Sequence, residues 1–234
     1  MKNFQEYTAA QNMARQAIDR LKQEIRPGMT EREIKKLAEI YLIENGSTSF
    51  WYHGIGALIH VGERSLVSQG GREYRVSDTA VKENDVITLD LAPTLNTCWG
   101  DFARTIFVED GLPVQNYADL KQPDHQRGIE AELKLHHYLM ETVTPDTTFE
   151  ELFANANALI IALGFENLDY ANNLGHSVEI LQQDRVYIEK GNAHKLSEYV
   201  GFTFEPHISC PGTGFGVKRE NIYYFGDDGK LCEL

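Results

Sequence analysis

The feature that most constrains this chain is an internal repeat of helix signals, in which one segment returns 118 positions later. Both copies open with a capping box, a threonine followed three positions later by a glutamate, and both continue with apolar residues at helical spacing. The boxes are Thr30 with Glu33 and Thr148 with Glu151, and the segments stop at Gly46 and Gly164. A repeat on this scale predicts two similar halves.

Length and composition fit a single globular unit. The chain has 234 residues, of which 42% are hydrophobic and 24% charged, enough for one large core. A further helix is predicted before each capped one, at residues 4–25 and roughly 117–142. The sequence therefore predicts an α+β fold, a single domain of residues 1–234 with two pseudo-symmetric helix-helix-strand halves at about 4–112 and 116–234.

Four acidic residues lie within or at the ends of predicted strands, where Asp and Glu are depleted. The strands are predicted at residues 86–90, 99–108, 201–205 and 214–225, and their carboxylates are Asp90, Asp101, Glu205 and Glu220. Two similar halves that face each other would bring these four carboxylates to one central axis.

Buried carboxylates require a compensating charge, because an isolated ionised carboxylate in an apolar segment costs several kcal/mol to desolvate. Two divalent ions would cancel four carboxylates and change the formal net charge from −13 to about −9. Two ions ~3.5–4 Å apart can activate a bridging water. His176, which follows Gly175, offers a nitrogen ligand, and such a mixed shell favours Mn, Co, Fe or Zn over Ca or Mg.

Charge and hydropathy exclude other classes of protein. A formal net charge of −13 would repel a phosphate backbone, so no nucleic-acid partner is expected. The longest apolar runs, such as residues 158–163, fall far short of the ~20 residues that span a bilayer, so no membrane association is expected. The N-terminus lacks an apolar signal-peptide core, which predicts a cytoplasmic protein.

Five short motifs, in order, resemble those of the pita-bread metallopeptidases, a family that includes methionine aminopeptidases, Xaa-Pro aminopeptidases and prolidases, with creatinase as a non-peptidase relative. The resemblance covers essentially the whole chain. The motifs are Leu89-Asp90-Leu91, Gly100-Asp101-Phe102-Ala103-Arg104-Thr105, Leu174-Gly175-His176, Phe204-Glu205-Pro206 and Val217-Lys218-Arg219-Glu220-Asn221.

The resemblance implies a pita-bread fold around a two-metal centre. Asp90 would chelate one ion, His176 and Glu205 would hold the other, and Asp101 and Glu220 would bridge both. A metal-bridging hydroxide would then attack a scissile carbonyl, with Glu205 as the proton acceptor and donor.

Peptidases of this family usually carry two further histidines that handle the substrate, and this chain lacks both. The two histidines would be expected near residues 67–72 and 182–184, and neither stretch contains one. His207 is one substitute candidate, because it lies two residues after Glu205 and strand alternation directs both side chains to one face. His53, in a glycine-rich aromatic segment, is the other.

The expected activity is that of an M24-type aminopeptidase with Xaa-Pro or related short-peptide specificity, because Arg104-Thr105 follows Asp101 as in the Xaa-Pro branch. The first predicted helix begins near Phe4, which suggests a catalytic domain alone, as in the shorter methionine aminopeptidases. Two alternatives stay open: a pita-bread hydrolase of a small amide or guanidine compound, and a catalytically silent binding module. The expected ligand is a short peptide or small amide. A homodimer is one assembly compatible with the sequence.

Overall fold

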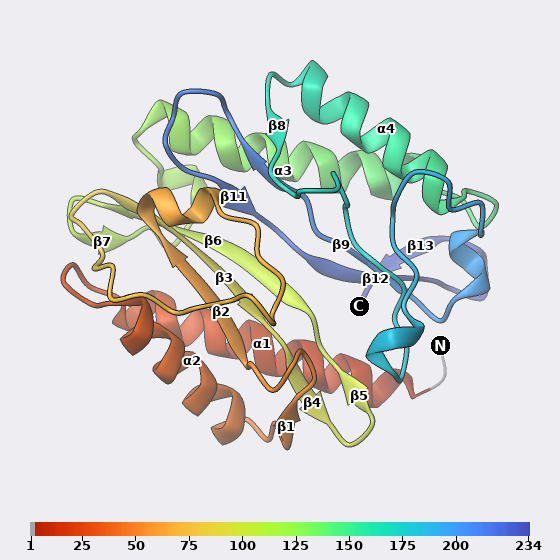
Figure 1. The fold of residues 1–234 in the computed structure, drawn as a ribbon, viewed down its shortest axis with the longest axis horizontal. Helices are drawn as coiled ribbons and strands as arrows, with labels where there is room; N and C mark the ends of the chain where they lie inside the picture. Colours follow the sequence, from red (N-terminus) through yellow and green to blue (C-terminus); the bar gives the residue numbers. More distant parts are fainter. Residues whose placement is uncertain (1–2) are drawn as a thin grey trace.

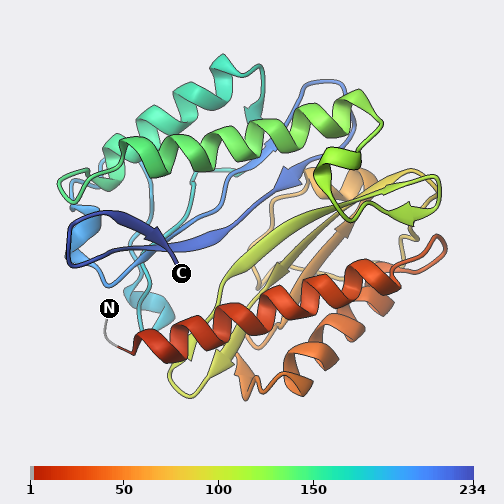
Figure 2. The same ribbon diagram turned by 180° about the vertical axis from the view of Figure 1, so that it is seen from behind.

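Two pairs of α-helices enclose a central set of strands in the computed structural model, which describes residues 3–234 (Figure 1). Residues 1 and 2 of the predicted domain lie outside this range. Figure 1 shows α1 and α2 on one side of the strands and α3 and α4 on the other; Figure 2 shows α1 and α3 from behind. The helices are α1 (Phe4–Glu24), α2 (Glu31–Glu44), α3 (Pro123–Thr142) and α4 (Phe149–Ala162).

Both predicted capping boxes are confirmed. Thr30 caps α2: its hydroxyl accepts from the Glu33 backbone N–H at 3.2 Å, and its own N–H donates to the Glu33 carboxylate at 2.8 Å. Thr148 and Glu151 make the same pair of bonds at the start of α4, at 3.1 and 2.8 Å.

The predicted start of the third helix near residue 117 is wrong. Residues Tyr117–Asp119 form a separate 3₁₀ turn (η2), and α3 begins at Pro123. Proline is favoured at the first helical position because its missing N–H has no intrahelical partner there.

The strands pair antiparallel in four small sheets, in the orders β2-β3-β6-β7, β1-β4-β5, β13-β12-β9 and β11-β10-β8. Short 3₁₀ turns connect some of them: η1 (Gly62–Leu66), η3 (Gln182–Asp184) and η4 (Leu196–Glu198). The strands are β1 (Ser49–Phe50), β2 (Ala57–Val61), β3 (Asp85–Leu91), β4 (Pro93–Leu95), β5 (Cys98–Trp99), β6 (Phe102–Glu109), β7 (Leu112–Pro113), β8 (Glu166–Asn167), β9 (Phe202–Phe204), β10 (His207–Ser209), β11 (Val217–Lys218), β12 (Asn221–Phe225) and β13 (Leu231–Glu233).

Two of the predicted strands, 99–108 and 214–225, are interrupted at their acidic residue. Asp101 lies between β5 and β6, and Glu220 lies between β11 and β12. The backbone N–H of Asp101 donates to the Gln11 side chain at 2.8 Å, and that of Glu220 donates to the Ala103 carbonyl at 3.0 Å. Each acidic residue is therefore held by a distant segment rather than by a strand ladder.

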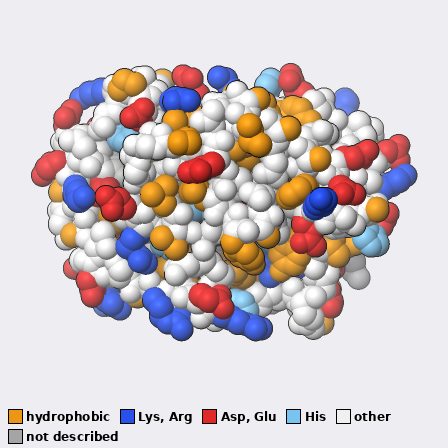
Figure 3. Space-filling model, turned by 45° about the horizontal axis from the view of Figure 1, so that its top comes forward, with side chains coloured by type: hydrophobic (Ala, Val, Ile, Leu, Met, Phe, Trp, Pro, Cys, Tyr) orange, Lys and Arg blue, Asp and Glu red, His pale blue; other side chains and the backbone are white. Residues whose placement is uncertain are grey.

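Two large hydrophobic clusters fill the interior. One runs from Met13 to Val108, and the other lies mostly between Leu120 and Leu231. This distribution supports our division of the chain into halves at about 4–112 and 116–234, which stays an interpretation. Charged side chains of both signs are scattered over the face shown in Figure 3. Within residues 3–234, no helix combines the length and the apolar character needed to cross a bilayer.

Candidate metal centre and substrate pocket

Three acidic side chains converge between the two helix pairs. Carboxylate oxygens of Asp90, Asp101 and Glu220 all lie within 4.8 Å of one another. Asp90 is part of β3, whereas Asp101 and Glu220 directly precede β6 and β12, and these strands run through the middle of the molecule (Figure 1). The fold thus places acids from both predicted halves side by side.

The other two predicted ligands adjoin this cluster. Nε2 of His176 lies 3.4 Å from Oδ2 of Asp101. Oε2 of Glu205 lies 3.0 Å from Nζ of Lys218, which is itself 2.6 Å from Oδ2 of Asp90. The structure therefore brings all five predicted ligands to one place.

Gly175 fixes the approach of His176. Its φ is +136°, and a Cβ there would lie 2.3 Å from the carbonyl oxygen of Thr203. The backbone N–H of His176 donates to Thr203 Oγ1 at 3.1 Å, and the N–H of Thr203 donates to the His176 carbonyl at 2.7 Å. Only glycine permits such a close approach of the two segments.

Hydrogen bonds also set the protonation of the His176 ring. Nδ1 donates to the Ser177 carbonyl at 3.0 Å, so Nε2 accepts, and its partner is Nη1 of Arg185 at 3.0 Å. Burial, with the Arg185 charge beside it, lowers the pKa of His176 to about 4. The ring is therefore neutral, the form that ligates metals, and its Nε2 lone pair accepts from Arg185 beside the cluster.

The acids at the centre resist ionisation. Burial raises the pKa of Asp101 well above its usual range, and the Asp90 and Glu205 charges raise it further. Burial also raises the pKa of Glu220 well above its usual range, and the charges of Asp101 and Glu205 raise it further. Among the described residues, neither carboxylate oxygen of the fully buried Glu220 finds a hydrogen-bond partner. Divalent cations would satisfy these oxygens, so the residues present fit such ions.

Lys218, to which the sequence analysis gave no role, enters the same cluster. Its Nζ is 3.8 Å from Oε2 of Glu220, in addition to its contacts with Asp90 and Glu205. Burial alone would lower its pKa, but these three carboxylates raise the pKa well above its usual range. The side chain is therefore an ammonium. Because the strand is interrupted between Lys218 and Glu220, strand alternation alone could not have placed the two side chains together.

Gln11 of α1 is a second residue that sequence reasoning missed. Its amide accepts from the Asp101 N–H at 2.8 Å and donates to the Asp101 carbonyl at 3.0 Å. Gly100 permits this contact, since a Cβ there would lie 2.9 Å from the Ala10 backbone. No local sequence signal links Gln11 to Asp101, 90 positions away.

Asp90 and Asp101 of the acidic cluster line a pocket of about 190 Å³. Pockets for drug-sized ligands usually measure about 300–1,000 Å³, so this one suits a small ligand. Four aromatic side chains contribute to its wall, and the lining includes Trp51, Tyr52, Tyr170, Tyr187, Asp90, Asp101, His176, Arg185, Glu205, His207 and Lys218.

Arg185 presents a fixed cation to this pocket. Nε donates to the Gln182 carbonyl at 3.0 Å, Nη2 donates to the Tyr187 hydroxyl at 3.2 Å, and Nη1 contacts His176. The guanidinium also lies 4.9 Å from the centre of the Trp51 ring, within cation–π range.

The two candidate substrate histidines occupy different surroundings. His207 lines the pocket as Glu205 does, and its Nε2 donates to the Ser65 carbonyl at 2.6 Å. Burial, followed by the Lys218 charge, lowers the pKa of His207 to about 3. His53 is exposed, has a φ of +55°, and places Nε2 at 3.0 Å from the side-chain nitrogen of Gln182. The roles predicted for both stay predictions.

Comparison with known proteins identifies the family. Residues 5–227 match the Peptidase_M24 family, metallopeptidase family M24, so the chain belongs to it. An Xaa-Pro dipeptidase of Pyrococcus furiosus is 26% identical over 207 residues, which cover 88% of this chain and 54% of the relative. An Xaa-Pro dipeptidase of Lactobacillus helveticus is also 26% identical over 207 residues, covering 88% and 51%. The chain spans about half the length of the curated relatives it matches.

Solved structures confirm the predicted α+β pita-bread fold. The prolidase from Pyrococcus furiosus aligns with a TM-score of 0.81 and 24% identity, covering 100% of this chain and 64% of that one. The X-Pro aminopeptidase from Thermotoga maritima MSB8 aligns with a TM-score of 0.80 and 22% identity, covering 98% and 59%.

Proposed function

We propose that this chain is a dinuclear metal-dependent hydrolase that cleaves Xaa-Pro bonds, or related bonds, of short peptides. The observation that carries the proposal is the convergence of four carboxylates and a neutral His176 at one small pocket, which all of them except the fully buried Glu220 line. The similarity to Xaa-Pro dipeptidases supports this specificity.

In this proposal, Asp90 would help to hold one ion, His176 and Glu205 the other, and Asp101 and Glu220 would serve both. When bound, two divalent ions of Mn, Co, Fe or Zn supply an activated water and polarise the scissile carbonyl. Asp101 and Glu220 would ionise as they ligate, because the ions offset the burial that otherwise favours their neutral forms.

Glu205 carries the proton transfers. Its side chain is 24% exposed, so one face remains open to the pocket. It would accept a proton as the water oxygen bonds to the scissile carbon, and then return the proton to the leaving nitrogen as the C–N bond breaks. His207 would contact the substrate from the same wall, after its Nε2–H turns away from the Ser65 carbonyl. His53 is the second candidate for that contact.

Arg185 would bind the terminal carboxylate of the peptide. The guanidinium is held by Gln182 and Tyr187, so little side-chain entropy is lost when it pairs with an anion. A ligand on Nε2 of His176 would release Nη1 of Arg185 for that carboxylate. The aromatic wall beside it, including Trp51, would contact the proline ring.

Metal analysis combined with a substrate panel tests the proposal. Protein reconstituted anaerobically with Mn²⁺, Co²⁺, Fe²⁺ or Zn²⁺ should bind about two ions per chain, as the two-metal arrangement requires. It should cleave Xaa-Pro dipeptides or tripeptides faster than Met-Ala-Ser. Asp101→Asn should lose at least one ion, whereas the exposed Asp228→Asn, a matched control, should lose none.

Each other outcome is informative. If none of the four metals binds, both the site and the mechanism are wrong. Faster release of Met than cleavage of Xaa-Pro would reverse the proposed specificity. No turnover of either peptide by metal-loaded protein would favour a small amide or another non-peptide substrate.

A further inference from the structure

Among the described residues, Lys218 is the one lysine whose ammonium lies within 4 Å of the carboxylates proposed as metal ligands. Its Nζ lies 2.6 Å from Asp90, 3.0 Å from Glu205 and 3.8 Å from Glu220. The side chain is only 16% exposed, so water screens these contacts poorly. The oxygens that it contacts belong to three of the five proposed metal ligands.

The backbone of Lys218 is anchored so that the side chain projects from a fixed point. Thr105 Oγ1 accepts from the Lys218 N–H at 2.8 Å and donates to the Lys218 carbonyl at 3.0 Å. On the other edge, Lys218 pairs with His207 across β10 and β11. The ammonium can therefore move away from the cluster only by rotation of its own side chain.

The charge balance of the site disfavours the presence of the ammonium and both ions together. Before any hydroxide joins them, two divalent ions balance four carboxylates, so an ammonium retained among them leaves one positive charge in excess. Like charges a few ångströms apart inside a protein repel strongly, because the local dielectric is low. The ammonium and an ion also compete for the same oxygens of Asp90 and Glu205.

We infer that Lys218 competes with divalent ions for the acidic cluster and thereby lowers the affinity of the centre for metal. The inference rests on the proposed function, because it concerns the ions of the same centre. Loading an ion requires the Lys218 ammonium to leave Asp90 and Glu205, and this displacement weakens binding.

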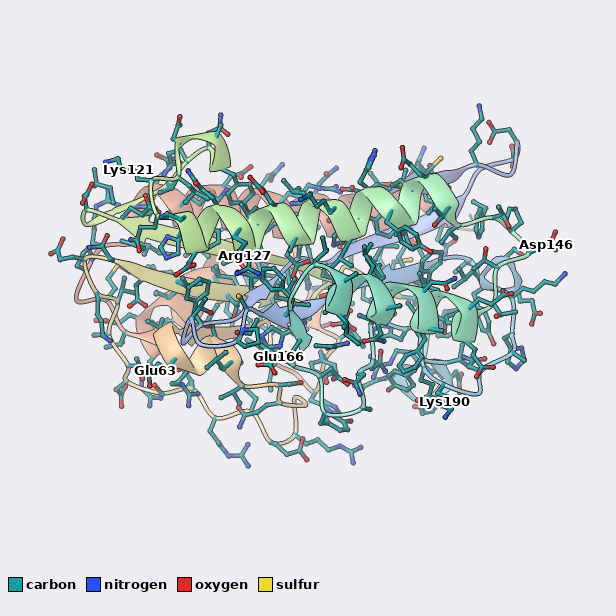
Figure 4. All side chains as sticks on the ribbon, turned by 90° about the horizontal axis from the view of Figure 1, so that it is seen from above. Glu63, Lys121, Arg127, Asp146, Glu166 and Lys190 are labelled. Atoms are coloured by element: carbon teal, nitrogen blue, oxygen red, sulfur yellow. The ribbon has the colours of Figure 1, made fainter. Side chains whose placement is uncertain are left out.

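Titration of the whole chain with Mn²⁺ tests the inference without any substrate. Lys218→Met keeps the length of the side chain and removes its charge. Lys190→Met removes the same charge from an exposed side chain at the periphery (Figure 4) and serves as the control. Free Mn²⁺ can be counted by electron paramagnetic resonance, and the Kd confirmed by isothermal titration calorimetry.

We expect Lys218→Met to lower the Kd of the tightest Mn²⁺ at least tenfold, which corresponds to about 1.4 kcal/mol. Lys190→Met and the charge-conserving Lys218→Arg should both stay within threefold of the unsubstituted chain. If Lys218→Met folds only with Mn²⁺ present, its Kd can be obtained from the loaded protein by competition with a chelator of known affinity.

An unchanged affinity in Lys218→Met would overturn the inference. A weaker affinity would also overturn it, and would show that Lys218 holds Asp90 and Glu205 in position for the ions. Either result would leave the proposed function intact if Xaa-Pro peptides are still cleaved. Failure of every variant to bind Mn²⁺, Co²⁺, Fe²⁺ or Zn²⁺ would instead defeat the proposed function and the inference together.

Discussion

Arg185 is the residue whose replacement should separate substrate recognition from metal binding. If its guanidinium binds the peptide carboxylate, Arg185→Gln should raise the KM for an Xaa-Pro dipeptide at least about tenfold, because a charge-assisted pair is lost. For the corresponding Xaa-Pro amide, which lacks the carboxylate, Arg185→Gln and the unsubstituted chain should have similar KM values. Steady-state kinetics on the acid and the amide measures this difference.

The exposed Arg127→Gln is a charge-matched control for Arg185→Gln (Figure 4). Metal content should be unchanged in both variants, since neither residue is a proposed ligand. An equal loss on the acid and the amide would show that Arg185 acts on His176 rather than on the substrate carboxylate.

His207→Ala should lower turnover at least ~100-fold while metal content and folding are retained, because removal of a transition-state hydrogen-bond donor usually costs ~2.7–4 kcal/mol. Its Nε2–H already serves the Ser65 carbonyl, so His207→Gln, which keeps an N–H donor, should restore part of the rate. Near-normal turnover of His207→Ala would indicate that another group, with His53 as the first candidate, supplies the hydrogen-bond donor. Loss of metal together with activity would indicate that His207 supports Glu205.

The five proposed ligands could be singled out from the sequence because each lies in a short motif of its own. Lys218, Arg185 and Gln11 could not, since their contacts are set by packing. Gln11 reaches Asp101 across 90 positions, and Lys218 reaches Asp90 across 128. Such pairs are visible only once α1 and β11 are placed against the strands that carry the acids.

At the scale of elements, α3 contains a buried carboxyl group that the proposed mechanism does not use. Glu132 is fully buried, and among residues 3–234 neither of its carboxylate oxygens has a hydrogen-bond partner. Burial raises its pKa well above the usual value, although the charges of Arg219, Lys218 and Arg104 oppose the shift. The folded protein therefore favours the neutral acid at this position of the helix.

This arrangement predicts a pH-dependent gain from Glu132→Gln. A folded-state pKa above the unfolded value gives stability that is present at low pH and is lost as pH rises toward the folded pKa. The variant has no group to ionise, so its stability relative to the unsubstituted chain should rise by about 1.4 kcal/mol per pH unit across that window. Urea unfolding at pH 5 and pH 8 measures the difference; the exposed Glu130→Gln on the same helix should show none. An equal difference at both pH values would mean that Glu132 is ionised when folded.

Helix caps could be predicted because the capping bonds of Thr30 and Thr148 join residues three positions apart. The breaks in the strands at Asp101 and Glu220 could not, because their backbone N–H groups bond to Gln11 and Ala103, far along the chain. A local pattern of β-rich residues continues through both breaks. The strand pairing ends at Asp101 and Glu220 because their backbone N–H groups bond to residues that are distant in the sequence.

At the scale of the whole molecule, the proposed centre joins two parts of the chain that have separate hydrophobic clusters. Asp90 and Asp101 come from the first predicted half, and His176, Glu205 and Glu220 come from the second. Ions held by both sets would bind the folded chain and not the unfolded one. Metal binding should therefore stabilise the entire molecule rather than one half of it.

We accordingly predict that Mn²⁺ at 100 times its Kd raises the free energy of unfolding by about 2.7 kcal/mol for the first ion bound, and that a chelator reverses the gain. Unfolding followed by circular dichroism and by tryptophan fluorescence should shift together. Trp51 and Trp99 both lie in the first half, whereas circular dichroism reports helices of both. Asp101→Asn should reduce the gain because it removes a proposed ligand of both ions. A gain seen in fluorescence alone, with circular dichroism unmoved, would mean that the ions bind within the first half and do not join the two.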